Sequence, residues 1–202
     1  MELNTNEFDA MQGGPKEFIH KHLEMRVLRK LGLQITGKNI LEIGCGSGYG
    51  AELINTYQPK SYLGIDLMPE QIELARQRKI ENCQFKIFDA TEINNLTKNE
   101  IFTSQIEEII VFRILHHIPE WKKVLKASYD KLPPGGSIYI IEPYRFLSKL
   151  ADLFLAWQHP KEALFTTTEF EIEMRHLGFQ TKTVSIGYGF AMQGTVLDKP
   201  LQ

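Results

Sequence analysis

Cysteine is scarce in this chain of 202 residues, which contains only Cys45 and Cys83. The two residues belong to no Cys-x-x-Cys or Cys/His ligand pattern, which argues against a structural zinc site and against a disulfide framework. No hydrophobic run approaches the roughly 20 residues that a membrane helix needs. Residues 1–10 are polar and carry acidic side chains, which is not the pattern of a signal peptide. We therefore expect a cytoplasmic protein without a transmembrane segment.

An excess of charge of either sign is also missing, because 23 Lys and Arg residues stand against 25 Asp and Glu residues, a formal net charge of −2. A chain with this balance has no general attraction to nucleic acid, and we expect no nucleic-acid partner. The sequence has no internal repeat and no low-complexity segment. A length of this kind predicts a single domain that spans residues 1–202 and buries its own core.

Short apolar segments alternate with segments of helical spacing through most of the chain. Strands are predicted at residues 39–43, 62–66, 84–88, 106–112 and 137–141, and helices at 15–31, 49–57, 69–79 and 119–131. This alternation is typical of a parallel sheet with helices on both faces.

The final third follows a different pattern. Helices are predicted at residues 144–158 and 168–177, followed by strands at 179–186 and 190–197. Two consecutive strands joined by a glycine-rich turn indicate an antiparallel hairpin. The whole pattern predicts an α/β fold with a doubly wound, mostly parallel, seven-stranded sheet that ends in this hairpin.

A glycine-rich segment follows the first strand, with Gly44, Gly46 and Gly48 at alternate positions. Glycines let the backbone turn sharply and approach a ligand closely. A tight strand-to-helix turn without any ligand gives the same pattern, so the loop by itself does not decide between the two interpretations.

Two acidic residues near this loop favour a nucleoside site. Glu42 lies inside the apolar first strand, where an unpaired carboxylate would be costly, so we expect it to have a partner. Asp66 ends the second strand, 18 residues after Gly48, at the spacing where an acidic side chain binds a ribose. Aspartate is also common in turns at strand ends, which is the alternative interpretation.

The identity of the nucleoside depends on position 49. A dinucleotide fingerprint, G-x-G-x-x-G, would place its third glycine there, but the residue is Tyr49. With its G-x-G-x-G loop after an acidic residue, the chain resembles a class I S-adenosylmethionine (SAM)-dependent methyltransferase of the small, single-domain, methyltransferase-11-like type. The resemblance covers residues 40–143 and extends more weakly to 194. An NAD(P)-binding oxidoreductase and a SAM-binding protein without transferase activity are the alternatives.

The resemblance implies a Rossmann-like fold and a site for SAM or its product S-adenosylhomocysteine. In the family, Glu42 and the glycine loop face the methionine part of SAM, Asp66 binds the ribose hydroxyls and Asp89 meets the adenine amino group. Arg113 stands beside the methionine part, where it binds the SAM carboxylate or an anionic acceptor, or faces solvent. The complete predicted set is Glu42, Gly44, Cys45, Gly46, Gly48, Asp66, Leu67, Asp89, Ala90 and Arg113.

Two departures from related enzymes bear on this prediction. Glu107 stands where the family usually begins its fourth strand with an aspartate, and that position is mostly structural. Metal-dependent, catechol-type relatives place an aspartate after the fourth strand, whereas this chain does not, so the resemblance implies no metal ion.

The candidate catalytic residues are His116, His117 and Tyr144. Methyl transfer from a sulfonium depends mainly on holding nucleophile, methyl group and sulfur in line. A general base is needed only when the acceptor keeps its proton until attack. In the alternative interpretation, one histidine packs and the other forms a hydrogen bond where a helix begins, so no catalytic residue follows from the sequence alone.

Acceptor choice is predicted to depend on the two segments that surround this core. Residues 1–33 form a helical cap, and residues 143–168 form a helical insertion on the substrate side. The insertion carries an apolar stripe, which either packs on the protein or lines an acceptor pocket: Tyr144, Phe146, Leu147, Leu150, Phe154 and Trp157. We expect a small, hydrophobic or aromatic acceptor. Its identity, the methylated atom and the oligomeric state do not follow from the sequence.

Overall fold

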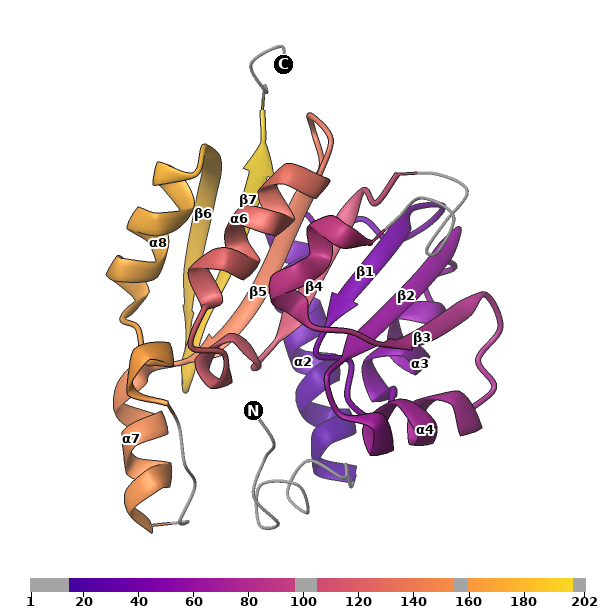
Figure 1. Cartoon of the computed structure of the whole chain (residues 1–202), viewed down its shortest axis with the longest axis horizontal. Coiled ribbons are helices and arrows are strands. Elements are labelled where there is room, and N and C mark those ends of the chain that lie inside the picture. The colour runs from indigo at the N-terminus through magenta and orange to yellow at the C-terminus, as the bar shows by residue number, and fades with distance from the viewer. Residues whose placement is uncertain (1–14, 97–104, 155–159, 198–202) are drawn as a thin grey trace.

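The computed structural model of the chain describes residues 15–96, 105–154 and 160–197. Within them, seven strands form one sheet in the order β3-β2-β1-β4-β5-β7-β6 (Figure 1). The strands are β1 (Asn39–Ile43), β2 (Ser61–Asp66), β3 (Cys83–Ile87), β4 (Glu108–Phe112), β5 (Ser137–Pro143), β6 (Phe179–Ile186) and β7 (Gly189–Val196).

Strands β1 to β5 run parallel, whereas β7 pairs antiparallel with both β5 and β6. Ile43, at the end of β1, pairs with Ile65 of β2 and Val111 of β4, so the carboxyl ends of these central strands lie at one edge of the sheet. Ligands of open α/β sheets bind at this edge, where the strand order reverses. The predicted doubly wound sheet and its C-terminal hairpin are confirmed.

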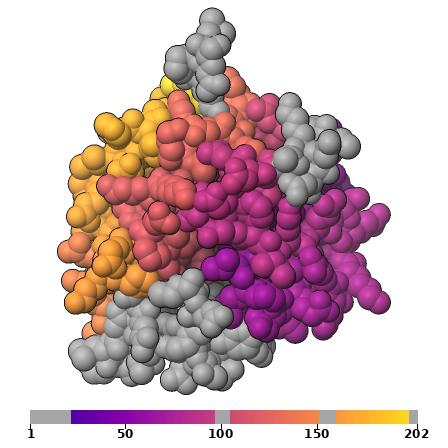
Figure 2. All heavy atoms as spheres, in the orientation of Figure 1, coloured from indigo at the N-terminus to yellow at the C-terminus, as the bar shows by residue number. Residues whose placement is uncertain are grey.

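Helices cover both faces of the sheet, because alternate residues of each strand point to opposite sides. On one side, α2 (Pro15–Leu31), α3 (Tyr49–Asn55) and α4 (Pro69–Gln77) pack in a buried cluster that contains Ile40. The neighbouring residue, Leu41, belongs to a second cluster, together with buried residues of the 3-10 helix η1 (Ala90–Asn95), α6 (Trp121–Lys131) and α8 (Thr167–His176). Figure 2 shows the N-terminal half of the chain beside its C-terminal third on one face of the molecule.

The remaining described elements are the helix α7 (Arg145–Phe154) and the two 3-10 turns η2 (Leu115–His117) and η3 (Lys161–Ala163). The helix predicted at 119–131 begins at Trp121, with Glu120 at its N-cap, and residues 115–117 form the separate turn η2. The helix predicted at 144–158 is described from Arg145 to Phe154, and the rest of that prediction lies outside the described residues. No helix in the described ranges has the length and apolar composition of a membrane span.

The far end of the 143–168 segment is anchored in the core. Phe165 is buried, and its ring centroid lies 4.8 Å from that of Trp121 on α6 and 4.7 Å from that of Phe170 on α8. Aromatic pairs at these separations stabilise a core beyond the area that they bury. This part of the segment therefore packs on the protein.

Glu107 has the structural role that its position predicts. Its carboxylate accepts hydrogen bonds from the backbone N–H of Asn39 (3.1 Å) and from Lys38 Nζ (2.8 Å), which joins the beginning of β4 to that of β1. Burial by itself would raise the pKa of Glu107, but these hydrogen bonds outweigh it and lower the pKa.

Candidate functional site

The glycine-rich loop connects β1 to α3 in a left-handed backbone conformation. The φ angles of Gly44, Gly46 and Gly48 are 71°, 53° and 86°, a region that other residues rarely adopt. At Gly44 the space is also closed, since a Cβ would lie 2.7 Å from Cγ1 of Ile114. Glycine at this position therefore lets the β1 loop and the segment after β4 lie in direct contact.

Glu42 lies beneath the loop and does not line the cavity. The carboxylate is fully buried, and Oε2 accepts a hydrogen bond from the hydroxyl of Tyr62 (2.7 Å). Burial, together with the neighbouring Glu42 charge, raises the pKa of Tyr62 well above its usual value, so the hydroxyl stays protonated as the donor. The expectation that Glu42 has a partner is confirmed.

Asp66 ties the glycine loop to the end of β2. Oδ2 accepts a hydrogen bond from the N–H of Gly46, and Oδ1 accepts one from the N–H of Met68, both at 3.0 Å. A carboxylate oxygen can accept more than one hydrogen bond, so hydroxyl groups of a ligand are suitable donors to Asp66.

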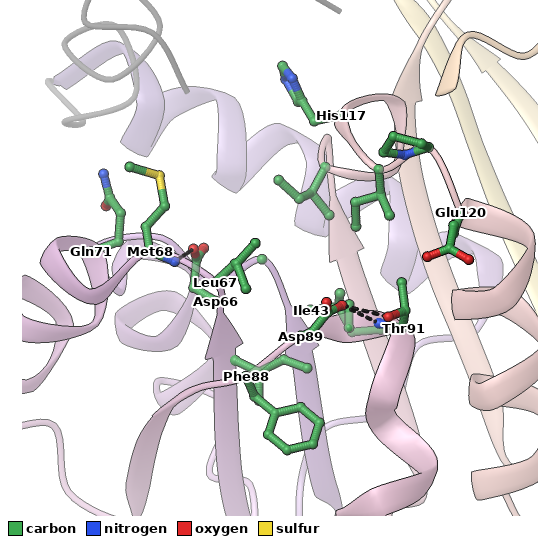
Figure 3. Close-up of a pocket in the computed structure, with 16 residues that line it drawn as sticks. Ile43, Asp66, Leu67, Met68, Gln71, Phe88, Asp89, Thr91, His117 and Glu120 are labelled. Carbon is green, nitrogen blue, oxygen red and sulfur yellow. Dashed lines mark hydrogen bonds between the residues drawn. The ribbon is translucent and has the colours of Figure 1, made fainter. Parts of the chain in front are cut away.

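Asp89 both caps a helix and lines the cavity. Oδ1 accepts hydrogen bonds from the N–H and the hydroxyl of Thr91, each at 2.8 Å (Figure 3). The turn interpretation is therefore correct for this oxygen. Oδ2 accepts no hydrogen bond from a residue in the described ranges, which leaves it available to a donor such as an amino group.

A cavity of about 230 Å³ opens at the carboxyl ends of the central strands. Its walls come from β1, β2, the segments that follow β3 and β4, and the beginning of α4, as Figure 3 shows. The lining residues are Ile43, Gly44, Ile65, Asp66, Leu67, Met68, Gln71, Phe88, Asp89, Ala90, Thr91, Ile114, His117, Ile118, Pro119 and Glu120.

The structure brings part of the predicted site together around this cavity. Gly44, Asp66, Leu67, Asp89, Ala90 and His117 line it. The other predicted residues are absent from its wall: Glu42, Cys45, Gly46, Gly48, Arg113, His116 and Tyr144. Cys45, Gly46 and Gly48 shape the loop behind Gly44, and Tyr144 Oη lies 2.6 Å from Ser185 Oγ of β6.

Glu142, at the end of β5, holds the turn that carries the two histidines. Oε1 accepts hydrogen bonds from the N–H groups of Ile114 (3.0 Å) and Leu115 (2.8 Å), and Oε2 lies 2.6 Å from His116 Nδ1. Complete burial raises the pKa of Glu142 to about 8, although the backbone hydrogen bonds oppose that shift. The rings of His116 and His117 are 4.2 Å apart, so the position of one constrains the other.

Arg113 points toward α2. Its φ is 53°, and its Nε lies 3.3 Å from the carboxylate of Glu24, which is only 2% exposed. The same Glu24 oxygen accepts a hydrogen bond from the hydroxyl of Tyr188, in the turn between β6 and β7. This cluster joins the N-terminal helix to the segment after β4 and to the C-terminal hairpin.

Arg78, a residue that sequence reasoning missed, clamps the glycine loop from the end of α4. Its Nε donates a hydrogen bond to the carbonyl oxygen of Ser47 (2.5 Å), and its guanidinium lies 3.7 Å from the ring centroid of Tyr49. An ion pair with Glu52 of α3 (2.7 Å) completes the contact. No signal near Arg78 in the sequence indicates this role, because the partners lie about 30 residues away.

Metal ligands are not grouped in the described ranges, where no three His, Cys, Asp or Glu side chains lie close enough together to hold an ion. The polar groups of the cavity are instead carboxylates, an amide and an imidazole on an apolar wall. Such groups suit an organic ligand with hydroxyl and amino donors.

A doubly wound sheet with a glycine loop after β1, an acid after β2 and a cavity between them defines a nucleoside-binding α/β protein. The family described as "Methyltransferase domain" matches residues 16–184, and the chain belongs to this family. This finding confirms the predicted class, a SAM-dependent methyltransferase, together with its fold and its cofactor SAM.

Curated relatives include the ubiquinone biosynthesis O-methyltransferase of Marinobacter nauticus, which is 22% identical over 163 residues. That match covers 76% of this chain and 68% of the relative. Other bacterial enzymes of the same name are matched over 41% to 44% of their own length, so the chain spans less than half of those relatives.

Solved structures share the fold at low sequence identity. The S-adenosylmethionine-dependent methyltransferase of Mesorhizobium loti is 14% identical and superposes with a TM-score of 0.69, over 85% of this chain and 97% of that one. Phosphoethanolamine N-methyltransferase 2 of Haemonchus contortus, solved in complex with S-adenosyl-L-methionine, is 15% identical with a TM-score of 0.65, over 88% and 53% of the two chains.

Proposed function

We propose that this protein transfers a methyl group from SAM to a small, apolar or aromatic acceptor. The observation that carries the proposal is the cavity at the carboxyl edge of the sheet. Asp66 and Asp89 lie on its β2 and β3 side, and His117 lies on its β4 side. A nucleoside held by the two carboxylates therefore leaves space near the histidine for a second molecule.

The β2 and β3 side fits the adenosine part of SAM. Asp66 can accept hydrogen bonds from ribose hydroxyl groups, and Oδ2 of Asp89 can accept a hydrogen bond from the adenine amino group. Leu67 supplies apolar surface for the base. When bound, SAM supplies a methyl group activated by a positively charged sulfur.

The β4 side fits an apolar acceptor that carries a hydroxyl group. Ile114, Ile118 and Pro119 make this wall apolar, and His117 and Glu120 are its polar groups. Relatives that are named O-methyltransferases favour oxygen as the methylated atom. A hydroxyl with an ordinary pKa keeps its proton at neutral pH, so its attack requires a general base.

We infer that His117 is this base, since it is the one predicted catalytic candidate that lines the cavity. In this mechanism His117 would accept the proton of the acceptor hydroxyl, and bound SAM would supply the methyl group to the oxygen and leave as S-adenosylhomocysteine. His116 and Glu142 hold the turn and keep the His117 ring in place. Tyr144, bonded to Ser185, has no part in the proton transfer.

The remaining proposals concern the surroundings of the site. We propose that the chain acts as one domain, with residues 1–33 as a cap and residues 143–168 as the segment that selects the acceptor. The ion pair between Arg113 and Glu24 supports the role of residues 1–33 as a cap. The exposed side chains of Phe146 and Leu150 on α7 support the role of residues 143–168 in selecting the acceptor.

We also propose a cytoplasmic location. Cys45 and Cys83 form no disulfide, which agrees with this location.

To identify the acceptor, the purified chain is incubated with methyl-labelled SAM and a small-molecule extract. Mass spectrometry is expected to detect labelled, chloroform-extractable products that are absent with the Asp66→Ala variant. Label that enters only protein or nucleic acid would contradict a small-molecule acceptor. S-adenosylhomocysteine binding without any labelled product would favour a SAM-binding protein that lacks transferase activity.

A further inference from the structure

One polar side chain in the wall of the cavity has no explanation within the fold. Gln71 lies in the first turn of α4 and is 2% exposed. Both atoms of its amide, Nε2 and Oε1, are buried, and neither has a hydrogen-bond partner in the described part of the chain. A buried donor and acceptor left unpaired destabilise a folded protein, so a glutamine at this position needs a reason.

Packing alone does not supply that reason. The other buried residues of α4, Ile72 and Ala75, are apolar and fully covered. An apolar side chain at position 71 would continue this buried surface without an unpaired amide. The contrast points to a ligand that pairs with the amide when the cavity is filled.

The position of the Gln71 amide indicates which part of a ligand it would contact. A Cβ at Gly46 would lie 3.7 Å from Gln71 Oε1, so the amide lies against the glycine loop. The N–H of Gly46 donates in turn to Oδ2 of Asp66. Gln71 of α4 and Asp66 at the end of β2 therefore both lie against Gly46, and both line the cavity on the side where Figure 3 labels Met68 and Leu67.

The two side chains at this point have complementary chemistry. An ionised carboxylate only accepts hydrogen bonds, whereas a primary amide both donates and accepts. A hydroxyl group that donates its proton to Asp66 keeps lone pairs for an amide N–H. Adjacent hydroxyls of a ribose present two such groups side by side.

We propose that Gln71 is a cofactor-binding residue that pairs with the ribose hydroxyls, its amide donating to an oxygen whose proton Asp66 accepts. This inference rests on the proposed function, because it takes the nucleoside of SAM as the ligand. It adds a residue on α4 to the site and makes Gln71 a determinant of selectivity for an intact ribose.

The test compares Gln71→Met with wild-type protein by calorimetric titration of S-adenosylhomocysteine. Methionine has a similar length and cannot replace the amide, so we expect affinity to fall about tenfold. The melting temperature of the ligand-free variant is expected to equal or exceed that of wild type, because an unpaired buried amide is removed. Unchanged affinity together with a lower melting temperature would overturn the proposal.

Gln193→Met is the matched control. Gln193, on β7, is also buried, but its Nε2 donates a hydrogen bond to Oη of Tyr139 on β5 (3.1 Å). Neither residue lines the cavity. This substitution is expected to lower the melting temperature and to leave S-adenosylhomocysteine affinity within twofold of wild type. An equal loss of affinity in both variants would assign the effect to general destabilisation and contradict a role for Gln71.

A second probe, 5′-methylthioadenosine, locates the contact, because it contains the adenosine part and lacks the amino acid part. Gln71→Met is expected to weaken its binding by the same factor as that of S-adenosylhomocysteine. A loss confined to S-adenosylhomocysteine would place Gln71 at the amino acid part and overturn the ribose assignment. Failure of wild-type protein to bind either compound would instead contradict the proposed function itself.

Discussion

Glu142 Oε2 and His116 Nδ1 lie 2.6 Å apart, although 26 positions separate the residues in the chain. The other oxygen of Glu142 accepts two backbone hydrogen bonds from the same turn. One buried carboxylate at the end of β5 thus fixes η2, which carries His117 at the cavity wall. The position of the proposed base therefore depends on a residue that does not line the cavity.

Replacement of Glu142 tests this dependence. Glu142→Ala leaves two N–H groups and the His116 ring without their acceptor, and we expect it to lower the free energy of unfolding by about 3–5 kcal/mol. Glu142→Gln keeps an oxygen for the two N–H groups and is expected to cost clearly less. Urea denaturation of both variants at pH 7 checks the order, and equal losses would show that the backbone hydrogen bonds contribute little.

Glu108 predicts a pH dependence of stability. It is buried, and burial raises its pKa to about 8, while Lys38 opposes the shift and Glu107 adds to it. Because the folded-state pKa lies above the unfolded value, this group contributes stability that is complete below about pH 4.5 and is lost as the pH rises through about 8. Near pH 9 the ionised, buried carboxylate of Glu108 therefore lowers the free energy of unfolding.

Glu108→Gln removes that charge. Between pH 5.5 and pH 9, the free energy of unfolding of the variant is expected to rise by about 3 kcal/mol relative to that of wild type. Urea denaturation at the two pH values measures the difference, and Glu142 titrates equally in both proteins. Parallel pH profiles would mean that Glu108 is ionised in the folded protein at both pH values.

The two carboxylates of the cavity should differ in their effect on cofactor affinity. Asp66→Ala is expected to weaken S-adenosylhomocysteine binding at least tenfold, because hydrogen bonds to a charged acceptor contribute about 1.5–3 kcal/mol. It also removes the acceptor for the Gly46 N–H. Asp89→Ala is expected to cause a smaller loss, since Asp89 meets a neutral base.

Calorimetry on both variants measures this order, with Asp130→Ala as the control. Asp130 is bonded to Lys126 on α6 and does not line the cavity. A larger loss for Asp89→Ala than for Asp66→Ala would reverse the assignment of ribose and adenine. A loss for Asp130→Ala would indicate an effect that does not act through the site.

The histidines can be separated once an acceptor is known. His117→Gln is expected to lower the rate of methyl transfer about a hundredfold or more while cofactor affinity stays near wild type. Tyr144→Phe, in which the bond to Ser185 is lost, should leave the rate nearly unchanged. Single-turnover rates with saturating SAM measure both. A small effect of His117→Gln would mean that the acceptor loses its proton without this base.

Local patterns predicted the fold well because each element carries its own signal. The strand at 39–43 is an apolar run bounded by a glycine turn, and Thr166 with Glu169 forms the capping box that begins α8. The spacing after the glycine loop identified Asp66, and the resemblance identified Asp89. Both residues line the cavity, and their contacts with a nucleoside stay predictions.

The rest of the site depends on contacts between distant positions. Gln71 looks like an ordinary surface residue of a helix, yet only 2% of it is exposed in the fold. In the sequence, Glu142 is an ordinary residue at the end of a strand, and Glu24 is one of several charged residues on α2. In the fold, Glu24 forms an ion pair with Arg113. Sequence periodicity reports which face of an element is buried, but it does not report which polar side chains meet there.

The most direct test of the central claim is a calorimetric titration of the full-length chain with S-adenosylhomocysteine and, separately, with NAD. We expect saturable binding of S-adenosylhomocysteine and no detectable binding of NAD. At a hundredfold excess of ligand over the dissociation constant, such binding also adds about 2.7 kcal/mol to the free energy of unfolding. Binding of NAD without binding of S-adenosylhomocysteine or SAM would contradict the account.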